Sequence, residues 1–108
     1  MRAVAVLILA LAFAGSALAG GNPEKGKAKA AQVCAVCHGA DGAKPVVPEN
    51  PILAGQYADY LAKALADYKT GKRSNPVMKA FADQLSNQEI ADVAAWFASQ
   101  KSSLHFQR

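Results

Sequence analysis

Large apolar residues recur three or four positions apart in the middle of the chain, between residues 56 and 69. They form one stripe: Tyr57, Tyr60, Leu61, Ala64, Leu65 and Tyr68. Because positions at this spacing lie on one face of an α-helix, the stripe predicts an amphipathic helix. Gly71 is expected to end it.

A first helix is predicted to begin at Pro23. Asn22 before it is a good capping residue, proline is well tolerated at the first helical position, and Glu24 places an acid in the first turn. This helix should run toward Val36. Between residues 39 and 55, three prolines and several turn-forming residues interrupt the helical pattern without the alternation of a strand, which predicts a long loop.

A last helix is predicted from about Asn87 to Gln100. Ser86 and Glu89 have the spacing of a capping box, and the apolar positions after them recur at helical spacing. A second loop follows Gly71, and a short helix is expected around residues 78 to 84. No strand pattern occurs, so the predicted fold class is all-α.

The composition limits the size of the core and the class of partner. The chain has 108 residues, enough for one domain, and its 52% hydrophobic residues are dominated by alanine, which makes a thin core. The formal charge of +4 is spread along the chain. Without a dense Lys/Arg stripe, a nucleic-acid partner is not expected.

The first nineteen residues have the pattern of a secretory signal peptide. Arg2 gives a short positive region, residues 3–14 are apolar, and Ala17-Leu18-Ala19 is a small-x-small cleavage site. Residues 20–108 would then form one periplasmic domain with a frayed tail from about residue 101. An uncleaved anchor is the alternative, although the apolar run is shorter than the ~20 residues that span a membrane.

The strongest chemical signal is Cys34-Ala35-Val36-Cys37-His38, the C-x-x-C-H pattern of haem c attachment. Two thiols at this spacing can form thioethers to neighbouring vinyl groups on one porphyrin edge. His38, the next residue, is then held beneath the iron as an axial ligand. The sequence therefore predicts one covalent haem c.

Other interpretations of the two cysteines fit less well. A thioredoxin-like dithiol needs a sheet, which the sequence does not offer. A zinc site needs four ligands, and the only candidate beyond Cys34, Cys37 and His38 is His105 in the tail. A disulfide is allowed outside the cytoplasm, but it leaves His38 and the long loop unexplained.

With these motifs the chain resembles the class I c-type cytochromes, in particular the small bacterial monohaem kind and the halves of dihaem periplasmic ones. The motifs that carry the resemblance are Cys34-Ala35-Val36-Cys37-His38-Gly39, Pro51-Ile52-Leu53-Ala54-Gly55, Gly71-Lys72-Arg73, Asn75-Pro76-Val77-Met78 and residues 85–97. The resemblance covers the chain from about residue 22 to 100. It implies a cytochrome c fold of about four helices, with the first and last crossing and the haem as most of the core.

Met78 is the predicted sixth iron ligand. The candidates are Met78, His105 and a lysine, and Met78 is the only methionine left once residues 1–19 are removed. It is expected in a proline-containing loop far enough after His38 to reach the opposite haem face. The alternative is that Met78 is an ordinary core methionine.

The resemblance also implies roles around the haem. The carbonyl of Pro51, with Pro48 as the fallback, would accept the Nδ1–H of His38. The side chains expected to wall the haem are Leu53, Tyr57, Leu61, Leu65 and Phe81. Arg73 and Gln56 are candidates for hydrogen bonds to a propionate, and a solvated Arg73 is the alternative. Gly26 is expected to let Trp96 approach the first helix closely, and the alternative is an ordinary glycine within a helix.

Histidine and methionine ligation together leave no open iron position, which favours electron transfer over catalysis. The expected function is a one-electron carrier between redox-partner proteins such as a membrane oxidase, a reductase or a periplasmic dehydrogenase. The alternative is a fixed electron-transfer subunit of a dehydrogenase or oxidase complex. A haem peroxidase would need an open iron, so neither enzyme activity nor a small-molecule substrate is expected. A monomer or weak dimer is predicted.

Overall fold

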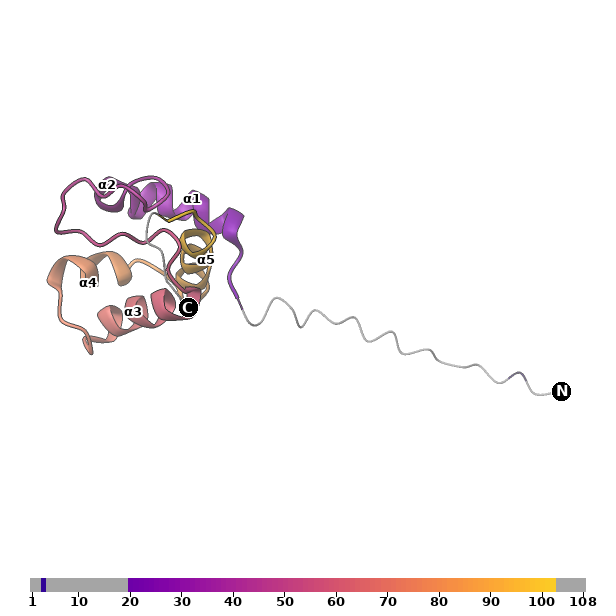
Figure 1. Ribbon diagram of the computed structural model, residues 1–108. Coiled ribbons are helices and arrows are strands. Elements are labelled where there is room, and N and C mark those ends of the chain that lie inside the picture. The colour runs from indigo at the N-terminus through magenta and orange to yellow at the C-terminus, as the bar shows by residue number, and fades with distance from the viewer. Residues whose placement is uncertain (1–2, 4–19, 103–108) are drawn as a thin grey trace.

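The computed structural model describes Ala3 and residues 20–102, and in this part of the chain all regular structure is helical (Figure 1). The helices are α1 (Pro23–Val33), α2 (Ala35–His38), α3 (Ala58–Thr70), α4 (Pro76–Ala82) and α5 (Asn87–Ala98). The all-α prediction is confirmed. Within the described residues, none of these helices has the length and apolar character needed to cross a bilayer. The predicted signal peptide, apart from Ala3, and His105 lie outside the described residues.

The first predicted helix ends earlier than expected. Asn22 caps α1 as predicted, since its side chain accepts hydrogen bonds from the backbone N–H groups of Glu24 and Lys25. However, α1 stops at Val33 rather than running toward Val36, and Cys34 is its C-cap. A new turn, α2, then starts, because the N–H of His38 donates to the carbonyl of Cys34 at 3.0 Å. The C-x-x-C-H segment thus has its own short helix.

Helices α1 and α5 cross and make the most extensive helix–helix contact in the described fold. Gly26 makes the close approach possible, as predicted: a Cβ at this position would lie 1.9 Å from the Asp92 carbonyl oxygen and 3.0 Å from the Cβ of Trp96. The buried carboxylate of Asp92 also accepts the backbone N–H of Asn22 at 2.7 Å. The start of α1 is therefore fastened to the middle of α5.

The remaining helix ends follow their local signals. α3 ends at Gly71, which is left-handed with φ 85°. Ser86 and Glu89 form the predicted capping box at the start of α5. α4 begins at Pro76, two residues before the predicted start, because Asn75 caps it. Met78 therefore lies in the first turn of α4 and not, as predicted, in a loop.

The chain between α2 and α3 is a long loop, as predicted, and it returns on itself through backbone hydrogen bonds. The carbonyl of Gly42 accepts the N–H groups of Leu53 and Ala54 at 2.9 and 3.2 Å. The N–H of Gly55 donates to the carbonyl of Phe97 at 2.9 Å, which attaches the loop to the end of α5. The loop is therefore a fixed wall of the fold.

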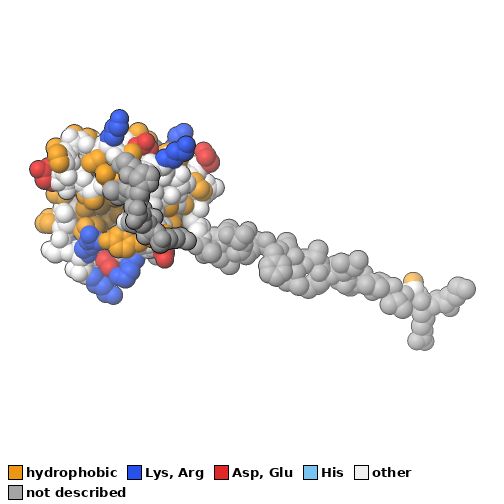
Figure 2. Space-filling view, viewed as in Figure 1, with side chains coloured by type: hydrophobic (Ala, Val, Ile, Leu, Met, Phe, Trp, Pro, Cys, Tyr) orange, Lys and Arg blue, Asp and Glu red, His pale blue; other side chains and the backbone are white. Residues whose placement is uncertain are grey.

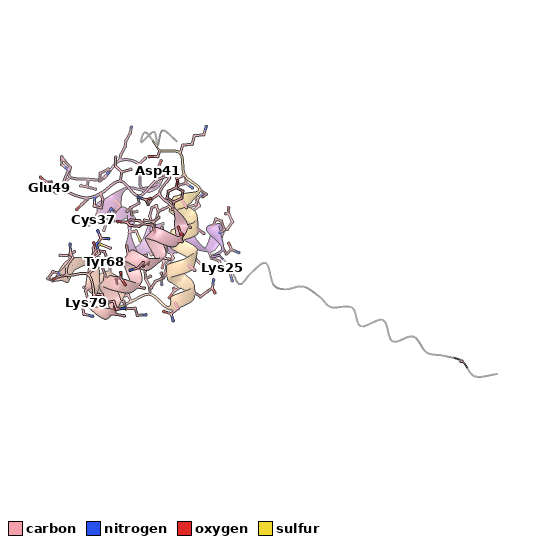
Figure 3. All side chains as sticks on the ribbon, turned by 60° about the horizontal axis from the view of Figure 1, so that its bottom comes forward. Lys25, Cys37, Asp41, Glu49, Tyr68 and Lys79 are labelled. Atoms are coloured by element: carbon pink, nitrogen blue, oxygen red, sulfur yellow. The ribbon has the colours of Figure 1, made fainter. Side chains whose placement is uncertain are left out.

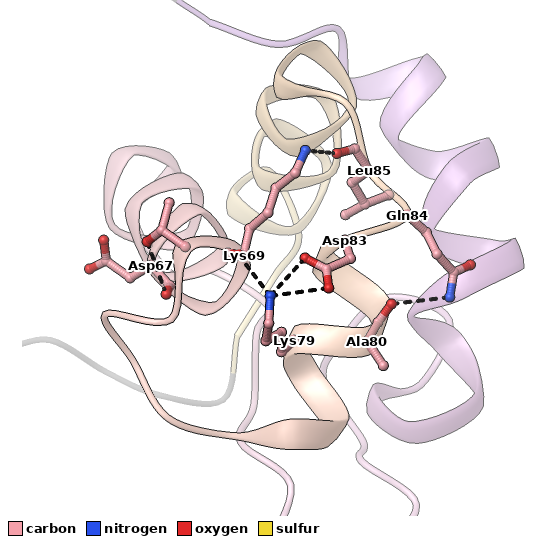
Figure 4. Close-up of polar contacts among 8 residues, drawn as sticks. Asp67, Lys69, Lys79, Ala80, Asp83, Gln84 and Leu85 are labelled. Carbon is pink, nitrogen blue, oxygen red and sulfur yellow. Dashed lines mark hydrogen bonds and ion pairs between the residues drawn. The ribbon is translucent and has the colours of Figure 1, made fainter.

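Two lysines fasten α4 to its neighbours (Figure 4). The Nζ of Lys79 in α4 donates to the carbonyl of Lys69 at the end of α3, at 3.0 Å, and pairs with Asp83. In return, the Nζ of Lys69 donates to the carbonyl of Leu85, between α4 and α5. These contacts join the consecutive helices α3, α4 and α5.

Candidate haem-binding site

A cavity of about 400 Å³ is lined by residues of α2 and the long loop and, facing them, of α3 and α4. Figure 1 shows how these four segments are arranged. Ligand pockets in proteins measure roughly 300–1,000 Å³, so it can hold a sizeable group. Its apolar walls include Leu53, Leu61, Leu65, Phe81, Val93 and Phe97. The four side chains from the long loop, α3 and α4 were predicted to wall a haem, and the two from α5 were not.

Both cysteines of the C-x-x-C-H segment line the cavity, and both are free thiols. Burial raises the pKa of the Cys34 thiol to about 11, because a thiolate is poorly solvated there. Burial therefore keeps the Cys34 sulfur in its neutral form. Figure 3 shows Cys37 on the same side of the molecule as Tyr68, another residue of the cavity wall.

His38 is buried, with 6% of its surface exposed, and its ring has a defined orientation. Its Nδ1 lies 3.1 Å from the carbonyl oxygen of Pro51, which can only accept, so Nδ1 carries the proton. The lone pair of Nε2 is thereby left for a metal. This is the contact predicted for Pro51, whereas Pro48 is not among the residues that line the cavity.

The loop also holds the carbonyl of Cys37 through contacts that were not predicted. This oxygen accepts hydrogen bonds from the backbone N–H of Val46 at 3.0 Å and from the side-chain amide of Asn50 at 3.1 Å. Asn50 precedes Pro51, so adjacent residues hold both the Cys37 backbone and the His38 ring. In the sequence, the only signal for this contact is that Asn50 stands directly before Pro51.

Met78 lines the same cavity from α4 and is partly buried. The structure thus brings together the two predicted axial ligands, His38 and Met78, from separate helices. Within residues 20–102 no group of three or more His, Cys, Asp and Glu side chains is placed to hold a metal ion. The zinc alternative would depend on His105, which the structure does not describe.

The rim of the cavity is polar and aromatic. Arg73 lies 3.5 Å from the hydroxyl of Tyr60 and 5.0 Å from the ring centre of Tyr68, and these tyrosines raise the pKa of its guanidinium. Arg73 and Gln56, the residues predicted to hydrogen-bond a propionate, both line the cavity. Tyr57, predicted as a wall, is 55% exposed and does not line it, because it is the N-cap residue before α3. Tyr60 and Tyr68 line it instead.

This donor set fits a covalent haem. The cavity is mainly apolar, two thiols lie on its wall, and a histidine on the same segment presents a free ring nitrogen. Among the described residues, nine hydrophobic residues are buried and four of them are alanines, so the core that the helices form by themselves is thin. A large apolar ring system in the cavity would complete the core.

Comparison with known proteins agrees with this geometry. The family model for cytochrome c matches residues 23–101. Cytochrome c4 of Pseudomonas aeruginosa is 50% identical over 98 residues, covering 91% of this chain and 48% of that protein. The thiosulfate dehydrogenase electron acceptor of Stutzerimonas stutzeri is 45% identical over 76 residues, covering 70% of this chain and 32% of that protein.

The fold has a counterpart among solved structures. The crystal structure of reduced recombinant cytochrome c4 from Pseudomonas stutzeri matches with a TM-score of 0.70 and 41% identity, over 78% of this chain and 48% of that one. This chain thus spans about half the length of the cytochrome c4 relatives. The fold is the cytochrome c fold, and the cofactor is one covalent haem c. The chain belongs to the cytochrome c family.

Proposed function

We propose that this protein is a periplasmic one-electron carrier. The observation that carries the proposal is that His38 from α2 and Met78 from α4 line the same cavity. A haem held between them would take one iron ligand from each of these two residues. Such an iron has no open position for a substrate, and methionine ligation raises its reduction potential.

Each residue of the site has a proposed role. Cys34 and Cys37 would hold the haem through thioethers, and Nε2 of His38 would bind the iron, because the carbonyl of Pro51 holds the ring in the tautomer with the proton on Nδ1. The Met78 sulfur would be the second ligand that the chain supplies to the iron. When bound, haem c supplies an Fe(III)/Fe(II) couple that gains and loses one electron. Arg73 and Gln56 at the rim are placed to hydrogen-bond a propionate.

The proposed partners are redox proteins, with no small-molecule substrate and no enzyme activity of the chain itself. In support, one relative is named as the electron acceptor of a thiosulfate dehydrogenase. On the face seen in Figure 2, basic and acidic side chains are interspersed. Lys63 and Lys79 each pair with an aspartate four residues later. Electrostatic steering toward a partner is therefore modest.

A visible spectrum tests the ligation. The purified holo-protein should be low-spin in both oxidation states, and the oxidised form should show the weak long-wavelength charge-transfer band of a sulfur–iron bond. It should not bind carbon monoxide when reduced. A high-spin spectrum or rapid carbon monoxide binding in the native protein would contradict the proposal.

Two further measurements test location and mobility. We propose cleavage after Ala19, so the intact mass of the periplasmic protein should correspond to a chain that begins at Gly20 plus one haem. A membrane-bound product that retains residues 1–19 would support an anchor instead. Co-purification in fixed ratio with a dehydrogenase or oxidase would favour the alternative of a complex subunit over a free carrier.

A further inference from the structure

Asn75 contacts the backbone of Met78 directly. The Oδ1 of Asn75 accepts hydrogen bonds from the N–H groups of Val77 and Met78, at 3.0 and 3.1 Å. Its backbone carbonyl accepts the N–H of Lys79 at 2.9 Å. The amides of residues 77 and 78 belong to the first turn of α4, where backbone N–H groups have no partner within the helix.

Little else holds this first turn. Val77 is 61% exposed, and Pro76 has no N–H to donate and is itself exposed. With seven residues, α4 is also far shorter than the roughly 12–15 residues that an isolated helix needs for stability. The cap is therefore a main restraint on the backbone conformation of Met78.

The far end of α4 is anchored independently. Ala82 is fully buried and Leu85, just after the helix, is nearly so. The contacts of Lys79 with the Lys69 carbonyl and of Lys69 with the Leu85 carbonyl hold this end to α3. Loss of the Asn75 side chain should therefore loosen the first turn while the rest of α4 stays in place.

We infer that Asn75 is a positioning residue for the Met78 sulfur. The inference rests on the proposed function, because it takes Met78 as an iron ligand. A thioether is a neutral, weak ligand, so its bond to iron persists because the chain presents the sulfur at high effective concentration. Fraying of the turn lowers that concentration and lets water or an added ligand compete for the iron.

The chain offers a matched control in the cap of α1. Asn22 also precedes a proline, and its Oδ1 accepts from the N–H groups of Glu24 and Lys25 at 2.9 and 3.1 Å. The first turn of α1 carries no proposed iron ligand. Asn22→Ala therefore removes an equivalent cap and should lower stability without changing the iron.

The experiment compares holo-proteins of wild type, Asn75→Ala, Asn75→Ser and Asn22→Ala. The readouts are the sulfur–iron band, the affinity of imidazole for the oxidised protein and the hydrogen-exchange rate of the Met78 amide. For Asn75→Ala we expect a weaker band, about tenfold tighter imidazole binding, or about 1.4 kcal/mol, and faster exchange at Met78. Asn75→Ser keeps a capping oxygen, so its band, imidazole affinity and exchange rate should be close to those of wild type.

Two results would overturn the inference in different ways. If wild type shows the band and Asn75→Ala binds imidazole no more tightly than Asn22→Ala, Asn75 does not position the sulfur, although Met78 ligation stands. If wild type itself lacks the band, Met78 ligation fails and the inference fails with it.

Discussion

Gly26 in α1 lies directly against the carbonyl of Asp92 in α5, so close that a Cβ on the glycine would be 1.9 Å from that oxygen. Since the obstacle is backbone, no side-chain rotation can make room. The two helices can cross at this distance only because residue 26 has no side chain.

Gly26→Ala should therefore destabilise the holo-protein, although alanine is the better helix former. Overpacking of this kind costs about 1–3 kcal/mol, because α1 and α5 must separate. Chemical denaturation followed by far-UV circular dichroism measures it. Lys25→Ala is the control, since Lys25 is exposed and lies across the molecule from Cys37 and Tyr68 of the cavity wall (Figure 3). Equal stability of both variants would contradict the prediction.

A second link between α1 and α5 predicts a dependence on pH. Lys29 pairs with Glu89 at 2.8 Å, and the backbone N–H of Ser86 donates to the same carboxylate. Together these two contacts lower the pKa of Glu89 from 4.5 to about 2. A carboxyl whose pKa is lower in the folded than in the unfolded protein stabilises the fold when it is ionised. This contribution is present above pH 4.5 and is lost as the pH falls toward 2.

Glu89→Gln should therefore be less stable than wild type at neutral pH, and the difference should shrink as the pH falls from 4.5 to 2. Because 34% of the Glu89 side chain is exposed, solvent screens the ion pair, so the stability difference should be small and should decrease further in high salt. Thermal melting of both holo-proteins across this pH range measures it. Glu24→Gln is the control, as no ion pair of Glu24 occurs among the described residues. A difference that stays constant with pH would count against the Lys29–Glu89 link.

Met78→Ala should remove the sixth ligand of the iron while the haem stays attached, because the two cysteines and His38 are unchanged. We expect the sulfur–iron band to vanish, the reduction potential to fall and exogenous ligands to bind. Visible spectra and a redox titration check this. Val77→Ala shortens a neighbouring side chain that also lines the cavity but has no donor atom for iron, so it should keep the sulfur–iron band. A native spectrum in Met78→Ala would show that another residue is the sixth ligand.

Cys34→Ser/Cys37→Ser made without haem should be largely unfolded. Ordering the chain costs about 1.5 kcal/mol per residue, and without haem the helices surround a cavity of about 400 Å³. Far-UV circular dichroism and thermal melting measure the helix that remains. If the haem-free variant is helical and melts cooperatively, the helices have a sufficient core among themselves.

Much of the helical framework could be predicted because its signals act over a few residues. Asn22 before Pro23, Gly71, and Ser86 with Glu89 each satisfy or end a neighbouring backbone turn, so these helix ends were placed correctly. The C-x-x-C-H pattern is equally local, since the attachment chemistry itself requires that spacing. It was sufficient to predict the cofactor.

Tertiary structure decided which side chains meet in the site. Tyr57 and Tyr60 belong to the same helical stripe, but the packing of α3 turns only Tyr60 toward the cavity. The contact of His38 with Pro51 needed the family resemblance to be foreseen, and that of Asn50 with Cys37 was missed. Such contacts join residues thirteen positions apart. They depend on how the whole loop folds back over α2, which no local pattern in the chain encodes.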